Sequence, residues 1–460
     1  MISKSAAELA LAAALETGGD FAEIFIEDTR RNRLTLMDGR LDSVTSDRAH
    51  GAGVRVFDGF SAYYATTNDT SPEGLIRAAK QAAAALSTAR KLSPRPLDVV
   101  VSPAPFPVRE RPGEVPGDRK SKLLHAACKA ARAEGNAIVQ VIASMSDLET
   151  DVLIANSEGV FATDRRTYTR LGVQAVASDG NGNQTGFEGP GMHMGYEMFD
   201  HLVDPEKAAR AAARSALTML TAPLCPAGVM PVAIESGFGG VIFHEACGHS
   251  LEATAVALGN SEFCGKLGQP IASSVVTAID DGTLPGEWGS INIDDEGTPT
   301  NRLVLIESGV LKNYMVDKLN SRRMGMPATG SSRRQSYAYA PTSRMRNTFI
   351  APGETEDGEI ISTMGDGLYA AKMGGGSVNP ATGEFNFAVS EGYWVKDGKI
   401  DHPVRGATLI GRGGQVLQRI DRVGKNLRLS QGMCGSVSGS VPVCVGQPLI
   451  RVTEMTVGGR

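Results

Sequence analysis

The sequence predicts an α+β protein of two domains, on three observations. Stretches in which hydrophobic and polar residues alternate, separated by Gly-containing turns, dominate the chain and indicate antiparallel strands. A few amphipathic stretches with capping residues indicate helices between them. With 460 residues, 42% of them hydrophobic, the chain is long enough for about two or three domains with substantial cores. We expect an N-terminal α/β domain over 1–220 and a β-rich C-terminal domain over 221–460.

The first 60 residues predict a helix followed by two β-hairpins. A helix fits the start better than a signal peptide, because Glu8 interrupts the apolar run and Gly18-Gly19 closes it. Alternating residues then surround Asp38-Gly39 and, further on, Asp58-Gly59. Such dipeptides are typical of two-residue hairpin turns, so antiparallel hairpins are expected here.

The rest of the N-terminal domain predicts helices around an antiparallel sheet. Thr70 to Glu73 has the cap, early Pro and acid of a helix start, and the helix should run to about Ala89. Seven of the 23 Pro residues lie in 91–120, which predicts an extended crossing segment. The remaining expected elements are a helix over 119–134 with Asp118 as cap, strands over 138–178, and a helix from Asp204-Pro205.

The C-terminal domain predicts one motif-bearing helix in a mainly β structure. A short strand over 231–236 leads into that helix, which contains HEACGHSLEATAVA. The remaining signals are hairpin turns at Asp280–Gly282, Glu307–Gly309, Thr382-Gly383 and Asp397-Gly398, and two short helices at about 357–364 and 415–423.

Charge and cysteine content exclude several classes of protein. With 46 basic and 51 acidic residues the net charge is −5, which argues against a nucleic-acid or anionic-membrane binder. The six Cys contain no CxxC pair, so we expect free thiols in a reducing compartment. No stretch approaches the ~18 apolar residues of a membrane span. These observations predict a cytoplasmic protein.

The sequence motif that carries chemistry is His244-Glu245-Ala246-Cys247-Gly248-His249, an H-E-x-x-x-H arrangement. On an ideal α-helix, residues five apart diverge by about 140°, too far for both imidazoles to bind one metal ion. A π-type turn with i→i+5 hydrogen bonding would bring them onto one face, and Gly248 is where the helix is easiest to widen. The alternative is two surface histidines on an ordinary helix.

A metal site of this kind predicts hydrolytic chemistry. Two neutral imidazoles and a third ligand would hold Zn²⁺ and activate a water molecule, and Glu245 would act as general base. The residues leave the third ligand open. The candidates are Glu252, Cys247, Cys264, an acid among 294–296, Cys434 and Cys444. Glu252 is feasible three residues beyond His249, and the glycines flanking Cys434 would let its backbone approach a crowded metal.

Two other segments have alternative interpretations. Asp294-Asp295-Glu296 precedes a turn and predicts either a solvated loop or a loop that shapes the site. Gly374-Gly375-Gly376 lacks the Lys-Ser/Thr of a phosphate-binding loop, so a strand closely approached by another backbone is favoured. Such a strand would suit a peptide bound alongside it by β-augmentation.

The sequence resembles the TldD/PmbA family, zinc metallopeptidases also called modulators of DNA gyrase. The resemblance covers most of the chain and is densest in GVIFHEACGHSLEA, INIDDEGTPTNRLVLIESGVLKNYMVDKLNSRRMGM, GSSRRQSYAYAPTSRMRNTFI, FAVSEGYWVKDGKI, VRGATLIG and VCVGQPLIRVTEMTVGG. Because H-E-x-x-x-H is present, the chain resembles the catalytic TldD branch rather than the TldE branch. The resemblance implies Cys434 as third ligand, with Glu252 supporting an imidazole and Cys444 a buried thiol.

The same resemblance implies how the protein works. It implies a partner subunit, either a TldE/PmbA-like chain or a second copy, that helps to enclose the site. The substrates would be flexible or unfolded peptides, as in peptide-antibiotic maturation or clearance of small unfolded proteins. The alternative is a non-catalytic regulatory or peptide-binding protein, a gyrase modulator with a structural metal. Glu245 favours the peptidase, since a purely structural site needs no general base.

Overall fold

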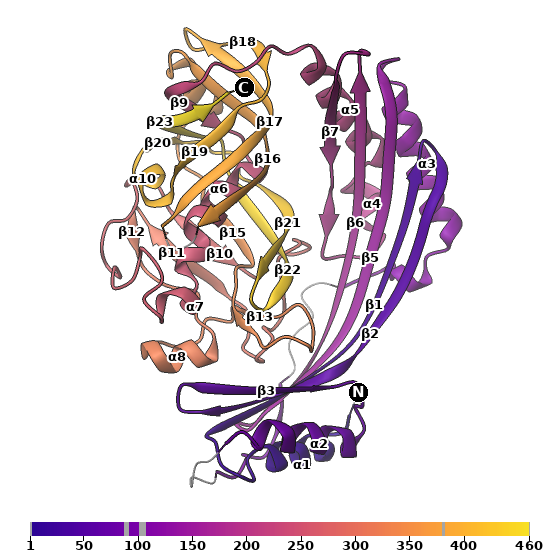
Figure 1. Ribbon diagram of the computed structural model, residues 1–460, viewed down its shortest axis with the longest axis vertical. Coiled ribbons are helices and arrows are strands. Elements are labelled where there is room, and N and C mark those ends of the chain that lie inside the picture. Colours follow the sequence, from indigo (N-terminus) through magenta and orange to yellow (C-terminus); the bar gives the residue numbers. More distant parts are fainter. Residues whose placement is uncertain (1, 87–91, 101–106, 380–381, 460) are drawn as a thin grey trace.

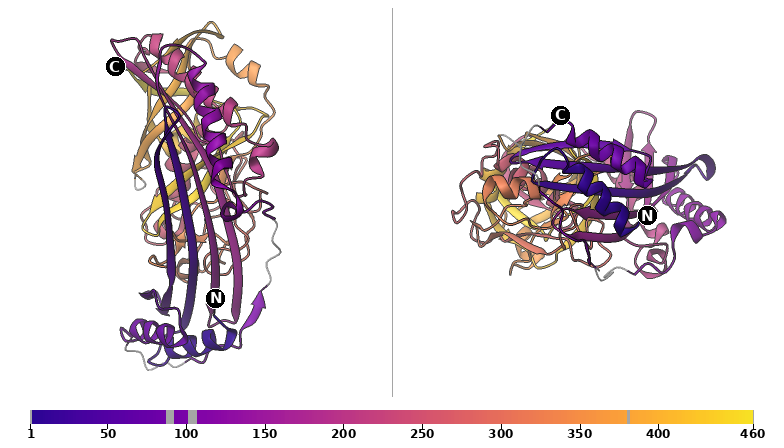
Figure 2. Two further views of the ribbon diagram at one scale, coloured as in Figure 1. Left: turned by 90° about the vertical axis from the view of Figure 1, so that its right-hand side faces the viewer. Right: turned by 90° about the horizontal axis from the view of Figure 1, so that it is seen from below.

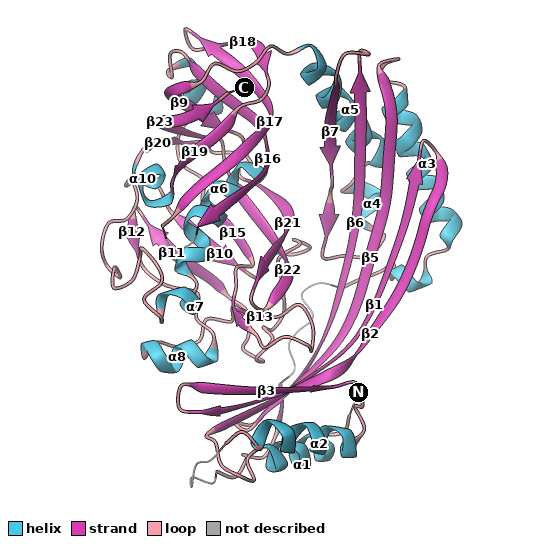
Figure 3. Ribbon diagram, viewed as in Figure 1, coloured by secondary structure: helices cyan, strands magenta, loops and turns pink. Residues whose placement is uncertain are grey.

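The computed structural model describes residues 2–86, 92–100, 107–379 and 382–459. It confirms the predicted α+β class: a sheet of very long antiparallel strands stands beside a β-rich C-terminal body (Figures 1 and 3). Within the described ranges, no helix is both long enough and apolar enough to cross a membrane.

The N-terminal sheet is built from four long strands and four short ones. Its main path runs in the order β3-β2-β1-β5-β6-β4, and β7 and β8 both pair with β6. Asp38 and Gly39 both have positive φ (52° and 74°), as the predicted two-residue turn between β1 and β2 requires. The strands are β1 (Phe21–Met37), β2 (Arg40–Asp58), β3 (Ser61–Thr67), β4 (Asp98–Val100), β5 (Ile138–Asn156), β6 (Val160–Ser178), β7 (Asn183–Glu188) and β8 (Gly191–Met192).

Helices cover this sheet near its two ends, and Figure 2 shows them in side view. Helices α1 and α2 bury Ala-rich faces on a core at one end, and α3 and α5 do so on a separate core at the other. Ser71 and Asp204 cap α2 and α5 as predicted. The helices are α1 (Lys4–Ala14), α2 (Pro72–Ala83), η1 (Pro112–Glu114), α3 (Gly117–Arg132), α4 (Met198–His201) and α5 (Pro205–Thr221).

Two N-terminal helix predictions need correction. Helix α3 begins at Gly117 with Pro116 in the cap position, so Asp118 lies in the first turn and is not the cap. There its negative charge still complements the helix dipole. Helix α2 ends at Ala83, earlier than predicted; the end of that prediction (87–89) and parts of the 91–120 segment lie outside the described residues.

The C-terminal body combines a six-stranded sheet and a closed barrel. The barrel arises because β16, in the order β16-β9-β23-β19-β17, also pairs with β17. The other sheet has the order β12-β11-β10-β15-β22-β21. The strands are β9 (Gly228–Ile234), β10 (Ala278–Asp281), β11 (Arg302–Glu307), β12 (Val310–Leu311), β13 (Ser332–Arg333), β14 (Thr342–Ser343), β15 (Asn347–Ile350), β16 (Gly367–Asn379), β17 (Glu384–Lys396), β18 (Lys399–Val404), β19 (Thr408–Arg412), β20 (Ile420–Val423), β21 (Arg428–Ser436), β22 (Gly439–Gln447) and β23 (Ile450–Gly458).

The predicted hairpin at Asp280–Gly282 is wrong. Strand β10 ends at Asp281 and pairs with β11, which begins only at Arg302, so a long loop joins them. Asp280 is fully buried and accepts a hydrogen bond from Arg346 Nε at 2.7 Å instead of forming a turn. A Cβ on Gly282 would lie 1.9 Å from Thr300 Oγ1, so this glycine permits close packing.

The second of the two short C-terminal helices is shorter than predicted. Helix α9 (Asp357–Ser362) matches the first, but α10 (Gly413–Gln418) ends before 420. Residues from Ile420 to Val423 form β20, because they pair with β23 and bury both of these apolar ends.

The loop between β10 and β11 joins the two parts of the molecule through buried ion pairs. Its acidic segment, Asp294–Glu296, is fully buried, which excludes a solvated turn. Glu296 contacts Arg55 of β2, and Asp295 lies 2.7 Å from Arg166 of β6. These acids therefore fasten the C-terminal body to the face of the N-terminal sheet.

Candidate metal centre

The H-E-x-x-x-H motif forms a π-helix, as its spacing predicts. After β9 the chain passes through η2 (Phe238–Gly240) and α6 (Val241–Phe243), and the π-helix η3 spans His244–Gly248. The His249 N–H donates to the His244 carbonyl, the i→i+5 bond that defines this helix type. Beyond it, η4 (His249–Leu251) and α7 (Ala253–Val256) are separated by the extended residue Glu252.

Gly248 is required by packing as well as by helix geometry. A Cβ at this position would lie 2.2 Å from Sδ of Met345, which is fully buried. A side chain larger than hydrogen would therefore push the motif away from the segment before β15.

Cys434 of β21 meets the two motif histidines. Its Sγ lies 3.2 Å from Nε2 of His244 and 3.3 Å from Nε2 of His249. All three atoms lie within 4.8 Å of one another, and the imidazole rings are nearly perpendicular at 84°. Three donors that converge with this geometry, one from a strand some 190 positions along the chain, match the ligand set of a tetrahedral zinc site.

The electrostatics of this centre favour a thiolate. Burial alone would raise the pKa of the Cys434 thiol. The opposing effect of His244 and His249 is larger and lowers this pKa to about 3. Burial lowers the pKa of His249, and Glu252 together with Cys434 raises it well above its usual range. A divalent cation would bind the lone pairs of the same nitrogen and sulfur atoms. Because these donors must be deprotonated to bind it, metal binding releases protons.

Glu252 and Arg344 hold the donors in place. Glu252 Oε2 lies 3.2 Å from His249 Nδ1, which leaves Nε2 of that ring directed at Cys434. Arg344, fully buried, lies with Nε 3.8 Å from Glu252 Oε1 and donates to the Cys434 carbonyl and, at 2.8 Å, to that of Gly439. One guanidinium therefore links the carboxylate that orients His249 to the hairpin that carries Cys434. No sequence pattern predicted a role for Arg344, which lies in no motif and is marked only by its place in the segment GSSRRQSYAYAPTSRMRNTFI.

Glu245 stands beside the three donors but not among them. Its side chain is 29% exposed, and its Oε2 lies 3.6 Å from His249 Nε2. No arginine or lysine of the described residues lies within 4.0 Å of this carboxylate. Glu245 can therefore accept a proton from a water molecule between itself and the donors.

The other candidates for third ligand lie elsewhere. Cys247 is buried in the C-terminal core and Cys264 packs against it. Cys444 is buried with Sγ 3.6 Å from Glu287, and burial raises the pKa of its thiol. The acids 294–296 are held at the domain interface. Across the described part of the chain, only His244, His249 and Cys434 form a cluster of at least three such groups with metal-binding spacing.

The fold and this centre together present a His₂Cys donor set with an adjacent carboxylate, an arrangement typical of metal-dependent hydrolases. Sequence profiles of known families identify the family. The PmbA/TldA metallopeptidase C-terminal domain matches residues 227–459, the central domain 110–220, and domain 1 residues 22–86. The chain belongs to the PmbA/TldD family of metallopeptidases.

Individual relatives agree with this assignment. A metalloprotease TldD homolog of Haemophilus influenzae is 36% identical over 448 residues, covering 96% of this chain and 93% of the relative. A zinc metalloprotease TldD homolog of Saccharolobus solfataricus is 31% identical over 293 residues, covering 63% of this chain and 64% of the relative. The crystal structure of a proposed DNA gyrase modulator from Thermotoga maritima superimposes with a TM-score of 0.77 at 22% identity, covering 95% and 96% of the two chains. This last likeness is one of fold.

Proposed function

We propose that the protein is a zinc-dependent peptidase that hydrolyses flexible or unfolded peptides. The observation that carries the proposal is the convergence of His244, His249 and Cys434 beside a carboxylate, Glu245, that has no arginine or lysine partner among the described residues. Membership of a metallopeptidase family supports hydrolysis, and one relative is named a zinc enzyme.

The residues present fit a zinc ion. Zinc prefers His nitrogen and Cys sulfur, and the low pKa of Cys434 provides the thiolate that such a site needs. A zinc ion held by three protein ligands would act as a Lewis acid and lower the pKa of a water molecule to about 7.

The chain's own residues supply the remaining chemistry. His244, His249 and Cys434 would hold the metal, and Glu252 would keep the Nε2 atom of His249 directed toward it. Glu245 would accept the proton of the attacking water and pass it to the amine of the leaving peptide.

We also propose that the protein works as a dimer, with a TldE/PmbA-like chain or with a second copy of itself. The support is the outer edge of β2. Residues 52–58 pair with β3, but 40–50 have no partner on that side among the described residues, and Leu41 and Val44 are more than half exposed. Natural proteins rarely leave such an edge uncovered. Sedimentation that finds an active monomer at working concentration would contradict the proposal.

The peptidase proposal is tested with purified protein, an unfolded polypeptide, and a candidate partner chain in parallel reactions. Metal analysis should find zinc, mass spectrometry should find cleavage products, and a chelator should abolish them until zinc is restored. The rival, a peptide-binding regulator with a structural metal, predicts stoichiometric zinc and no products in any reaction.

A further inference from the structure

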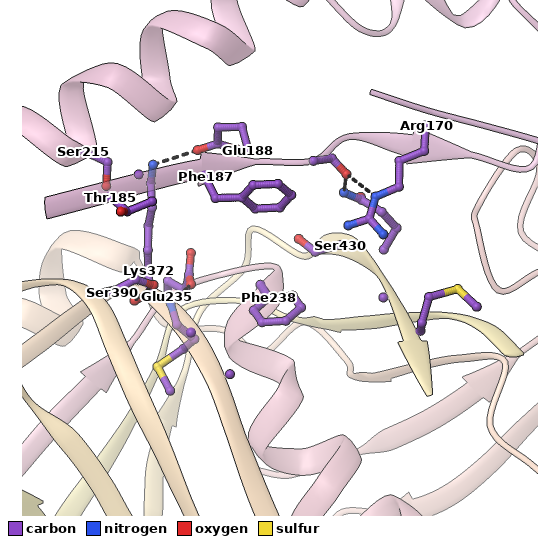
Figure 4. Close-up of a pocket in the computed structure, with 18 residues that line it drawn as sticks. Arg170, Thr185, Phe187, Glu188, Ser215, Glu235, Phe238, Lys372, Ser390 and Ser430 are labelled. Atoms are coloured by element: carbon purple, nitrogen blue, oxygen red, sulfur yellow. Dashed lines mark hydrogen bonds and ion pairs between the residues drawn. The ribbon is translucent and has the colours of Figure 1, made fainter. Parts of the chain in front are cut away.

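A cavity of about 600 Å³ lies between the N-terminal sheet and the C-terminal body (Figure 4). One wall comes from β6 and β7, and the other from β16, β21 and the segment before the motif helix. The cavity shares two chain segments with the candidate metal centre. Phe238 lies six residues before His244, and Gln431–Met433 lead directly to Cys434.

Arg170 of β6 lines this cavity without a carboxylate partner. Its Nε donates to the Gly189 carbonyl at 3.1 Å, and no carboxylate of the described residues lies within 4.0 Å of its guanidinium. Burial lowers the pKa of Arg170, and the nearby positive charge of Arg33 adds to that effect. A half-buried cation in this setting is short of a counter-ion.

The two acids that line the same cavity do not supply one. Glu188 lies 2.7 Å from Lys372 and is engaged by it. Glu235 accepts a hydrogen bond from the Met373 N–H, and burial raises the pKa of its carboxyl to about 8, so it carries little charge at neutral pH. Figure 4 shows both acids toward one end of the cavity and Arg170 at the other.

Aromatic rings lie between the two ends. Phe187 projects from β7 and Phe238 from the opposite wall, with space between them (Figure 4). A Cβ on Gly189 would lie 2.7 Å from the Phe187 ring and 3.0 Å from Arg170 Nη2. This glycine therefore lets the ring and the guanidinium lie side by side, which places an apolar surface next to a cation.

We propose that this cavity binds a carboxylate of the peptide substrate on Arg170, with a neighbouring apolar side chain between Phe187 and Phe238. The inference rests on the proposed peptidase function for its choice of ligand. The carboxylate can come from the C-terminus of the peptide or from an acidic side chain, and both offer the planar pair of oxygens that a guanidinium recognises.

The test measures binding separately from cleavage. In the full-length Glu245→Gln protein, fluorescence anisotropy would follow a labelled apolar hexapeptide ending in a free carboxylate, the same peptide with a C-terminal amide, and the amide with one internal Glu. We expect at least one carboxylate peptide to bind about 10-fold or more tightly than the neutral amide, as a charge-assisted contact predicts. Whichever carboxylate is preferred identifies its source.

Substitutions then assign the preference to Arg170. Arg170→Met should remove it while leaving the neutral amide within about 2-fold, and Arg170→Lys, which keeps the charge, should retain part of it. Arg33→Met removes the same charge from the same face of the sheet without altering the cavity lining, and should preserve the preference.

Three results would overturn the inference: no carboxylate preference, an unchanged preference in a folded Arg170→Met protein, or an equal loss in Arg33→Met. Cleavage by the wild-type protein without carboxylate preference would reject this cavity site alone. A carboxylate preference in a protein that cleaves nothing would reject the peptidase proposal alone.

Discussion

The domain interface and the candidate metal centre both bury ionisable groups, but the interface pairs acids with arginines, whereas the centre gathers three metal-binding donors. At the interface, Arg55 lies between Glu23 and Glu296, with its side chain 2% exposed. At the metal centre, two imidazoles and a thiol converge, and the carboxylate of Glu245 beside them stays partly exposed. The difference separates two uses of buried charge. At the interface the chain itself supplies the arginines that face the buried acids, whereas the centre is an arrangement of donors suited to a cation from outside.

The pKa of Glu23 shows how strongly the arginines at the interface stabilise a buried carboxylate. Burial alone would raise this pKa. Arg55 and Arg334 together have a larger, opposing effect, so the net shift of the pKa is downward. Such a group contributes stability that is present above its unfolded pKa and is lost as the pH falls through the folded value. The contribution of Glu23 to the stability of the interface should therefore be lost in acid, whereas the centre should respond to metal supply.

The largest expected effect is the loss of metal and activity in Cys434→Ala. Removing one of three ligands should lower zinc occupancy and reduce peptide hydrolysis by more than about 10³-fold, with little change in the thermal midpoint of the zinc-free protein. Cys444→Ala, an equally buried thiol outside the cluster, is the matched control and should keep both zinc and activity. Full zinc loading and turnover in Cys434→Ala would transfer the ligand role to Glu252.

The reverse pattern is expected for Arg55→Met. It leaves Glu296 and Glu23 buried with less positive charge, so the free energy of unfolding should fall by about 3–5 kcal/mol. The zinc content per folded molecule should stay unchanged. Arg48→Met breaks an ion pair to Asp28 in which the arginine side chain is 57% exposed, and should change the free energy of unfolding far less. Equal losses in urea titrations of both variants would show that burial does not distinguish them.

Glu252 belongs to both kinds of cluster, because it contacts His249 and lies near Arg344. Glu252→Gln keeps the shape but removes the charge that holds the imidazole, so zinc affinity should weaken by about 10–100-fold. Competition with a chromogenic chelator measures this directly. An unchanged affinity would mean that packing alone orients His249.

The smallest effect is expected from Glu235, a buried acid with little compensation. Burial raises its folded pKa to about 8, against an ordinary value of 4.5, so between these values the folded protein binds more protons than the unfolded chain. The free energy of unfolding should therefore fall as the pH rises through this window. Glu235→Gln should remove that dependence, so that the stability of the variant relative to wild type rises between about pH 5 and about pH 8. Parallel stability curves for the two proteins would contradict the shifted pKa.

Local patterns in the sequence predicted the elements whose cause is local. The Asp38-Gly39 turn, the caps Ser71 and Asp204, and the π-turn of the motif all follow from residues close together in the chain. The π-turn is the most informative of these, because the five-residue spacing of the histidines cannot serve one metal on an ordinary α-helix.

Features that depend on distant partners were missed or misread. Asp280–Gly282 has the composition of a turn, but Asp280 is buried against Arg346. The acids 294–296 suggested a loop near the site, yet Asp295 and Glu296 meet arginines of the N-terminal sheet. Arg344 carries no local pattern at all. In each case the deciding contact joins residues that only the folded chain brings together.

The central claim, that Glu245 transfers protons at a metal held by other residues, is tested most directly by Glu245→Gln. Zinc content and peptide hydrolysis would be measured on the same purified sample, with a mock purification to exclude contaminating protease. The account predicts one zinc per chain, as in wild type, and hydrolysis reduced by about 10²–10⁴-fold. Near-normal turnover with full zinc would contradict the role of Glu245, and loss of zinc would show that this carboxylate is itself a ligand.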